Sequence, residues 1–139
     1  MLSKKQILSA KDIKSEVVHV PEWATDGDDA VMVFGLNGNE RDEYEASIVE
    51  FHGSGKKQTQ TMNMQRLRAK LCSMVIRNPD GSRMFDEDEV DILGAKSAPA
   101  LQRVFEAGQR LSGITEEEVE ALAKNFASEE NAGSGSASL

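Results

Sequence analysis

The sequence predicts an α+β fold, with an N-terminal β-hairpin packed on a bundle of four to five helices and a disordered C-terminal tail. Three observations support this prediction. Two β-rich runs, residues 17–20 and 30–34, flank a Gly-containing loop, as in a hairpin. The later segments repeat apolar residues at helical spacing, and several open with a capping residue. The last residues are rich in Ser, Gly and Ala and contain no apolar anchors.

The chain divides into three expected parts. These are an N-terminal arm with a short helix (residues 1–14), a single α+β domain (residues 15–126) and a disordered Gly/Ser tail (residues 127–139). Ser3 is the expected cap of the short helix, whose only apolar anchors are Ile7 and Leu8. That helix is expected either to dock on the domain or to fray.

The expected hairpin begins with the strand Val17–Val20, which Pro21 ends because proline cannot donate to a strand ladder. Trp23 is expected to fold back onto the core. The loop around residues 25–29 is polar and acidic, and we expect it to be too long for a tight two-residue turn. In the second strand, Val31 and Val33 should share one face.

The first long helix is predicted to start at Asn37, a good N-cap, with Glu40 three residues later as in a capping box. Glu40, Asp42 and Glu43 suit the positive end of the helix dipole. The apolar face of this helix is expected to comprise Tyr44, Ile48 and Phe51. Gly53 should end it, and residues 53–61 read as a flexible basic linker.

The second half is predicted to be helical. One stripe comprises Met64, Leu67, Leu71, Met74 and Val75. The turn Asn78–Gly81 should join two very short strands. Three further helices are expected to start at Asp86, Ser97 and Thr115. Their buried residues should include Val90, then Leu101, Val104, Phe105, Gly108 and Leu111, and finally Val119, Leu122, Ala123 and Phe126.

Composition excludes several function classes. The net charge of -8 and the pI of about 4.8 argue against a dedicated nucleic-acid binder, which needs clustered Lys and Arg. No apolar run is long enough for a membrane span, and we expect no signal peptide. The single cysteine, Cys72, rules out an internal disulfide and fits a reducing cytosol.

The sequence shows no constellation for catalysis or metal binding. His19 and His52 share no short motif, and Cys72 has no neighbouring His, so packed or surface roles are expected for all three. A calcium-loop pattern after Ile76 lacks the Asp required at its first position. We therefore expect a protein that is not an enzyme and needs no cofactor or metal.

The order of motifs resembles the tail assembly chaperones of long-tailed, siphovirus-type bacteriophages. An opening SKKQILSAKDIKSEVVHVPEW is similar to the family's helix and extended V-x-V-P-E-W segment. VMVFGLNGNERDEYEASI is similar to its strand and G-L-x-G-x-E-R-D helix, and RLRAKLCSMVIRNPDGSRMF and the residues up to Phe126 resemble its helical half. The loops ATDGDDA and HGSGKKQTQTMN are longer than the family pattern leads us to expect.

This resemblance implies a non-enzymatic helper in the host bacterial cytoplasm, absent from the mature virion. It implies a tape measure protein as partner, kept soluble while tail tube subunits are recruited, and a frameshifted longer form of the chain as a further partner. Neither nucleic acid nor a membrane is implied, and self-association is left open. We expect acidic helix starts to contribute to partner binding, with these candidates: Glu40, Glu43, Tyr44, Glu45, Asp86 and Glu87.

Two alternatives from other classes remain at this point. One is a structural head–tail connector or minor tail protein, which would stay in the virion. The other is a small acidic binding adaptor directed at a host protein. Mass spectrometry of purified particles separates the first from a chaperone, and pull-down from host extract identifies the second.

Overall fold

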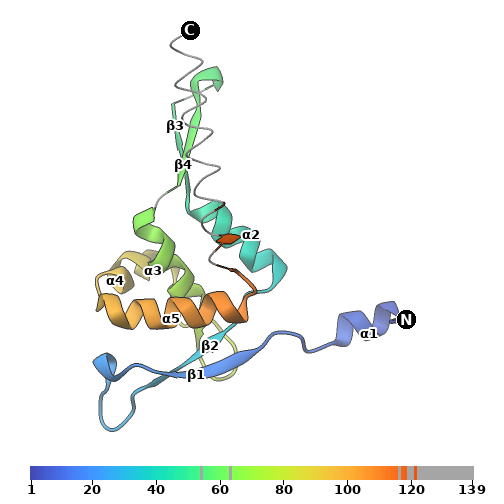
Figure 1. Cartoon of the computed structure of the whole chain (residues 1–139), viewed down its shortest axis with the longest axis vertical. Coiled ribbons are helices and arrows are strands. Elements are labelled where there is room, and N and C mark those ends of the chain that lie inside the picture. The colour runs from blue at the N-terminus through green and yellow to red at the C-terminus, as the bar shows by residue number, and fades with distance from the viewer. Residues whose placement is uncertain (54, 63, 116, 119–120, 122–139) are drawn as a thin grey trace.

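The computed structural model describes residues 1–53, 55–62, 64–115, 117–118 and 121. Three antiparallel strands form a sheet in the order β1 (Ser15–His19), β2 (Ala30–Phe34) and β5 (Ile76–Arg77). Two helices, α3 (Met64–Val75) and α5 (Ala98–Leu111), pack against this sheet. Figure 1 shows both helices above β1 and β2, so the α+β prediction is confirmed.

The predicted hairpin is present, and β1 and β2 pair from Ser15–Phe34 to His19–Ala30. Its first strand starts two residues earlier than predicted, and Val20 lies outside it as the cap of the next turn. After Pro21, a short 3-10 helix, η1 (Pro21–Trp23), turns the chain. As expected, the connection between the strands, residues 20–29, is longer than a two-residue turn. At its tip, however, Thr25 and Asp28 exchange backbone hydrogen bonds of 2.9 and 3.0 Å, so a tight turn lies within the loop. Asp26 and Gly27 between them have φ of 53° and 82°, as a two-residue hairpin turn requires.

Helix α2 (Gly38–Ser47) begins as predicted, with both hydrogen bonds of the Asn37–Glu40 capping box present. It ends earlier than predicted, because the chain continues as β3 (Val49–His52), which pairs antiparallel with β4 (Thr59–Met62). The predicted helix through residue 52 and the predicted linker at 53–61 are therefore wrong. A second hairpin, closed by η2 (Gly55–Lys57), replaces them and pairs the backbone groups that a linker would leave to water.

The second half follows the predicted order of turns and capped helices. The Gly81 amide donates to the Asn78 carbonyl at 2.8 Å, and the predicted strand after this turn is reduced to one bridge between Arg77 and Arg83. The remaining elements are η3 (Glu87–Glu89), α4 (Val90–Gly94) and α5, for which Ser97 is the cap. The capping box of Thr115 is present in part, since the Glu118 amide donates to the Thr115 hydroxyl at 3.1 Å. The predicted last helix beyond residue 121 and the tail lie outside the described residues.

The core lies where α3 and α5 meet the sheet. Gly108 lets the two helices approach, since a Cβ there would lie 3.0 Å from Val75. The fully buried side chains include Val33, Ile48, Leu71, Met74, Val75, Ile76 and Val104. Trp23 is half-buried against this core, as predicted.

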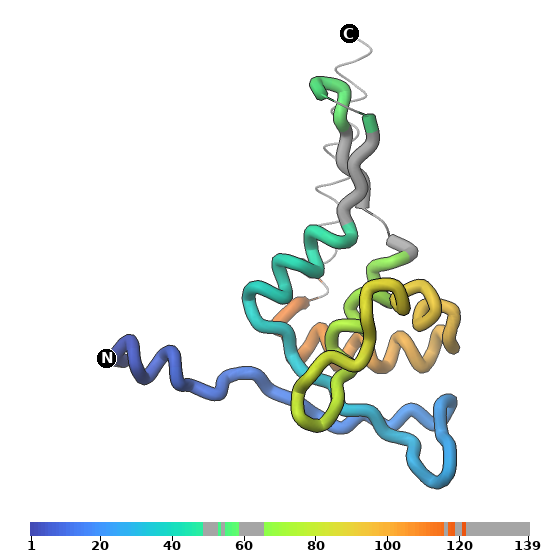
Figure 2. The backbone as a smooth tube through the Cα atoms, turned by 180° about the vertical axis from the view of Figure 1, so that it is seen from behind, coloured from blue at the N-terminus to red at the C-terminus, as the bar shows by residue number. Residues whose placement is uncertain are grey.

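Helix α1 (Lys4–Ser9) has the predicted Ser3 cap but buries none of its residues. Ile7 and Leu8 are 57% and 75% exposed, so the arm does not dock on its own domain. Figures 1 and 2 both show the arm projecting from the start of β1, away from the helices. Among the described residues, no helix has the length and apolarity needed to cross a membrane.

Candidate functional site

The first predicted acidic residues lie on α2 and pair with arginines that follow α3. Glu40 is only 16% exposed and pairs with Arg77, while Arg83 lies 3.5 Å from Glu40 and 3.0 Å from Glu43. Burial opposes ionisation of Glu40, but hydrogen bonds from the Asn37 amide and Arg77 outweigh it and lower the pKa of Glu40. These carboxylates therefore tie α2 to the turn after β5.

Tyr44 and Glu45, next along α2, also have partners within the chain. Tyr44 is 3% exposed, and its hydroxyl donates to the Leu67 carbonyl at 3.0 Å. Burial raises the pKa of Tyr44 well above its usual value. Glu45 lies 3.3 Å from Arg41, which also pairs with Glu118 at 2.7 Å. Tyr44 is a core residue, whereas Glu45 keeps a partly exposed carboxylate.

Asp86 and Glu87 mark the start of η3. The Asp86 amide donates to Glu89 at 2.8 Å, which closes the predicted capping box. Glu87 pairs with Lys70, which is 4% exposed, and lies 2.9 Å from Arg66. Hydrogen bonds from Lys70 and then Arg66 lower the pKa of the Glu87 carboxyl. Glu87 thus neutralises a buried ammonium on α3.

The remaining polar clusters do not form a reactive centre in the described part of the chain. Cys72 is fully buried, and burial raises the pKa of its thiol to about 12, which disfavours the reactive thiolate near neutral pH. His19 pairs with Asp29 at 3.0 Å on the surface. Asp86, Asp88 and Glu89 place carboxylates within 4.8 Å of one another, but helix capping already accounts for acids at this position. The His52 side chain lies outside the described residues.

One apolar hollow was missed by the sequence reasoning. It lies between η1 and α4, has a volume of about 450 Å³, and we call it the Trp23 groove. Its lining consists of Glu22, Trp23, Ala24, Thr25, Phe85, Glu89, Ile92, Leu93 and Lys96. Ile92 is 67% exposed although it is a large apolar residue on a capped helix. Exposed apolar surface of this kind marks an interaction site more often than an isolated apolar residue does.

Trp23 carries a buried, unsatisfied donor. Its indole Nε1 is buried and has no hydrogen-bond acceptor within the described residues. A buried tryptophan N–H normally finds an acceptor, because leaving it unpaired costs roughly 1–3 kcal/mol. The groove is lined by residues from 22–25 and from 85–96, which come together only in the folded chain. The only sign of the groove in the sequence was the position of Trp23 shortly after Pro21.

Several contacts hold the walls of the Trp23 groove in place. The Trp23 amide donates to the Val20 carbonyl at 3.0 Å. Arg103 of α5 donates to both oxygens of Glu22, at 2.8 and 3.1 Å, and this bond lowers the pKa of Glu22. On the other wall, Leu93 of α4 is 5% exposed. These contacts hold both walls, so the groove is a surface that can accept an apolar side chain.

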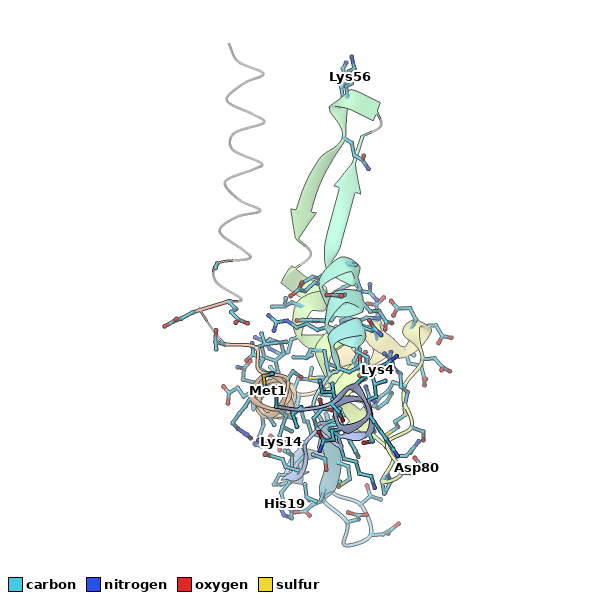
Figure 3. The ribbon with its side chains drawn as sticks, turned by 90° about the vertical axis from the view of Figure 1, so that its right-hand side faces the viewer. Met1, Lys4, Lys14, His19, Lys56 and Asp80 are labelled. Atoms are coloured by element: carbon cyan, nitrogen blue, oxygen red, sulfur yellow. The ribbon has the colours of Figure 1, made fainter. Side chains whose placement is uncertain are left out.

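A second exposed feature is the hairpin of β3 and β4. Lys56 and Lys57 lie at its closed end and are exposed. In Figure 3, Lys56 stands at one end of the molecule, while His19 and Asp80 lie at the other. The hairpin thus presents a basic tip on a chain whose net charge is -8.

Comparison with known proteins identifies a family. A family model described as phage tail assembly chaperone matches residues 3–125. No curated protein and no solved structure matches the chain.

Proposed function

The chain belongs to the phage tail assembly chaperone family, and we propose that it binds the tape measure protein of its phage, keeps it soluble and helps recruit tail tube subunits around it. Family membership supports the general role in tail assembly and indicates a non-enzymatic protein. The identity of the client follows from the family resemblance of the motifs. The Trp23 groove is the observation that supports a binding surface on this chain.

The groove suits a client helix with an exposed apolar stripe. Trp23, Phe85 and Ile92 offer apolar area to such a stripe. Recognition of an amphipathic helix in a groove uses a few such apolar contacts. Covering the apolar stripe of a long helical client would block its self-association, which is the physical basis of the proposed chaperone activity.

The acidic surface would act at a longer range. Glu43, Glu45, Asp86 and Glu87 are at least partly exposed despite their internal partners. With a net charge of -8, the chain should attract basic clients and repel other copies of its own acidic body. Reversal of Glu43 and Glu45 to Lys should slow client binding mainly at low salt, which distinguishes steering from groove contact.

The direct test is co-expression with the tape measure protein encoded by the same phage. The wild-type chain should raise the soluble fraction of that protein, and Ile92→Asp should lower it by about tenfold, because an Asp would be desolvated in the contact. Met84→Asp is the matched control, since Met84 is 44% exposed and does not line the groove. No gain in solubility with the wild-type chain would refute the proposed client.

We further propose that the protein acts in the host bacterial cytoplasm and is absent from the finished virion. Mass spectrometry of purified particles tests this directly. Stoichiometric recovery of the chain in virions would instead favour a connector or minor tail protein. A tandem pull-down from infected cells would also detect a frameshifted longer form of the chain, if one is made.

A further inference from the structure

We propose that the free edge of β1 is a second docking site, at which an extended segment of a partner protein joins the sheet as a further strand. The segment has a basic end, and its side chains alternate between the two faces of the sheet. This edge takes extended chain, whereas the Trp23 groove suits a helix. The inference therefore goes beyond the proposed client and can be tested without it.

The position of β1 leaves one side of the strand open, since the sheet has the order β1, β2 and β5. Two hydrogen bonds at the ends of the β1–β2 pair show which backbone groups are used. The Gly35 amide donates to the Lys14 carbonyl at 2.9 Å, and the Val20 amide donates to the Asp29 carbonyl at 2.6 Å. Bonded and non-bonded pairs alternate in an antiparallel ladder, so the even-numbered residues of β1 bond to β2.

The odd-numbered residues Ser15, Val17 and His19 therefore turn their backbone amides and carbonyls to the outer edge of β1. No strand pairs with this edge within the part of the chain that the structure describes. One outward group already meets a side chain, since Arg103 of α5 donates to the His19 carbonyl at 3.5 Å. Residues 15–19 contain neither Lys nor Pro, and their register has no bulge. Such an edge is a template for another strand.

A hollow of about 610 Å³ provides space for side chains on the α5 side of this edge. Glu16 and Val18 of β1 line it together with residues of α5 and Ile114, and none of the described lining residues comes from β2. The hollow therefore lies on the outer side of β1. Val18 and Ile114 are nearly buried and give it an apolar floor. An added strand turns every second side chain to this face of the sheet.

The opposite face of the edge also offers an apolar neighbour. Val17 points away from the hollow and is 54% exposed. Across the β1–β2 pair it lies opposite Met32, which is half-buried. A β-branched side chain on the added strand would pack beside Val17 and remove part of its area from water. Apolar contacts on both faces therefore support the backbone hydrogen bonds.

The charges at the two ends of β1 set the direction of the segment. Lys11 and Lys14 precede the strand, whereas the hairpin loop and η1 after it are acidic. Figure 1 shows the arm and this loop at opposite ends of β1. A segment whose basic end lies beside the loop is therefore complementary. In an antiparallel arrangement, which is the more stable per residue, that end is the N-terminus of the segment. The acids beside it are Glu22, Asp26, Asp28 and Asp29.

Amide exchange in the full, isotope-labelled chain, followed by NMR, tests the proposal. The probe is an acetylated peptide amide of sequence Lys-Lys-Val-Thr-Val-Thr. At a peptide concentration of about ten times its Kd, exchange at Ser15, Val17 and His19 should slow by about tenfold. Exchange at Glu16 and Val18, whose amides already bond to β2, should change little. The matched control peptide has N-methyl groups on its Val and Thr amides, so it keeps the side chains but should neither pair nor protect.

A variant of Val17 separates the edge from the fold. Val17→Pro removes an outward amide without breaking a bond to β2, and proline is tolerated on an edge strand where its missing N–H faces solvent. This variant should bind the probe at least tenfold more weakly in an NMR titration. Val17→Thr keeps the amide and the β-branched shape, so it should bind within about threefold of the wild type. Circular dichroism checks the fold of both variants.

Several outcomes would overturn the proposal. These are protection that does not alternate along β1, equal binding of the N-methylated peptide, and unchanged affinity of a folded Val17→Pro chain. Alternating protection that appears without the peptide and grows with the concentration of the chain would show a second copy at the edge, and would refute the proposed occupant. If Val17→Pro does not fold, the exchange pattern with the two peptides decides. The co-expression test uses neither peptide nor Val17, so the proposed function can fail independently.

Discussion

Glu87 was predicted to contact a partner, and its ion pair with the buried Lys70 indicates that it also stabilises the folded chain. Lys70 is 4% exposed on α3, while its partner Glu87 is 60% exposed. Removal of one partner costs about 3–5 kcal/mol for a fully buried pair and about 0–1 kcal/mol for an exposed one. Since only one partner of this pair is buried, Glu87→Ala should destabilise the fold by about 1–3 kcal/mol.

The matched variants separate the pair from its surroundings. Lys70→Met removes the buried ammonium and keeps most of its stem, so it should cost less than about 1 kcal/mol. Glu87→Ala in the Lys70→Met background should then add little, which gives a coupling energy of about 1–2 kcal/mol. Asp91→Ala is the control, because Asp91 is 86% exposed and lies 3.6 Å from Arg66; its cost should be below about 0.5 kcal/mol.

Urea unfolding followed by Trp23 emission measures these differences. With an m-value of about 1–3 kcal/mol per molar urea, Glu87→Ala should lower the midpoint by roughly 1 M at an unchanged slope. The reasoning is refuted if Glu87→Ala is as stable as the wild type, or if Lys70→Met is the more costly change. In either case Lys70 would not depend on Glu87.

Three further predictions follow from burial and close contacts. Cys72, whose thiol pKa is raised to about 12 by burial, should resist iodoacetamide at pH 8 in the folded chain and react after unfolding in urea. The pKa of Glu40 lies below its usual 4.5 despite burial, because the Asn37 amide and Arg77 donate hydrogen bonds to the carboxylate. Its contribution to stability is therefore present above pH 4.5 and is lost as the pH falls through the folded pKa. Thermal melts in acid should show a weaker dependence of stability on pH for Glu40→Gln than for the wild type. Gly35→Ala should cost about 2 kcal/mol or more in urea unfolding, because its Cβ would lie 2.5 Å from the Leu111 carbonyl oxygen.

The parts of the fold that the sequence predicted correctly are those with a local cause. The Asn37 cap, the break at Pro21 and the Ser97 cap each depend on residues within a few positions, and each lies where the pattern placed it. The apolar stripe of α3 could also be predicted, because apolar residues at helical spacing over a long segment indicate an amphipathic helix. Local rules of this kind are enough for the fold class.

The error at residues 48–62 shows where such rules fail. Ile48 and Phe51 fit a helical face, but a β-branched Val49 and the Thr-rich segment opposite it suit strands equally well. Pairing of β3 with β4 makes this segment a strand, and no local signal reports a pairing partner seven to thirteen residues away. Short apolar segments remain ambiguous between helix and strand for this reason.

The sequence shows that most of the candidate contact residues are acidic, but it does not show which of them form ion pairs within the fold. Glu40 meets Arg77 across 37 positions, and Glu87 meets Lys70 across 17, so the sequence alone could not show that both acids serve the fold. The Trp23 groove was invisible for the same reason, since its walls come from η1 and α4. Interaction surfaces built from distant segments need the tertiary arrangement to be seen.

Helix α1 has its own cap although none of its residues is buried. A six-residue helix is marginal in water on its own, since helix nucleation is costly and few hydrogen bonds follow it. Even so, α1 has a full capping box from Ser3 and Gln6, which satisfies its first amides without any help from the domain. A helix stabilised in this way loses less conformational entropy when it docks, so its apolar residues can be buried at lower cost.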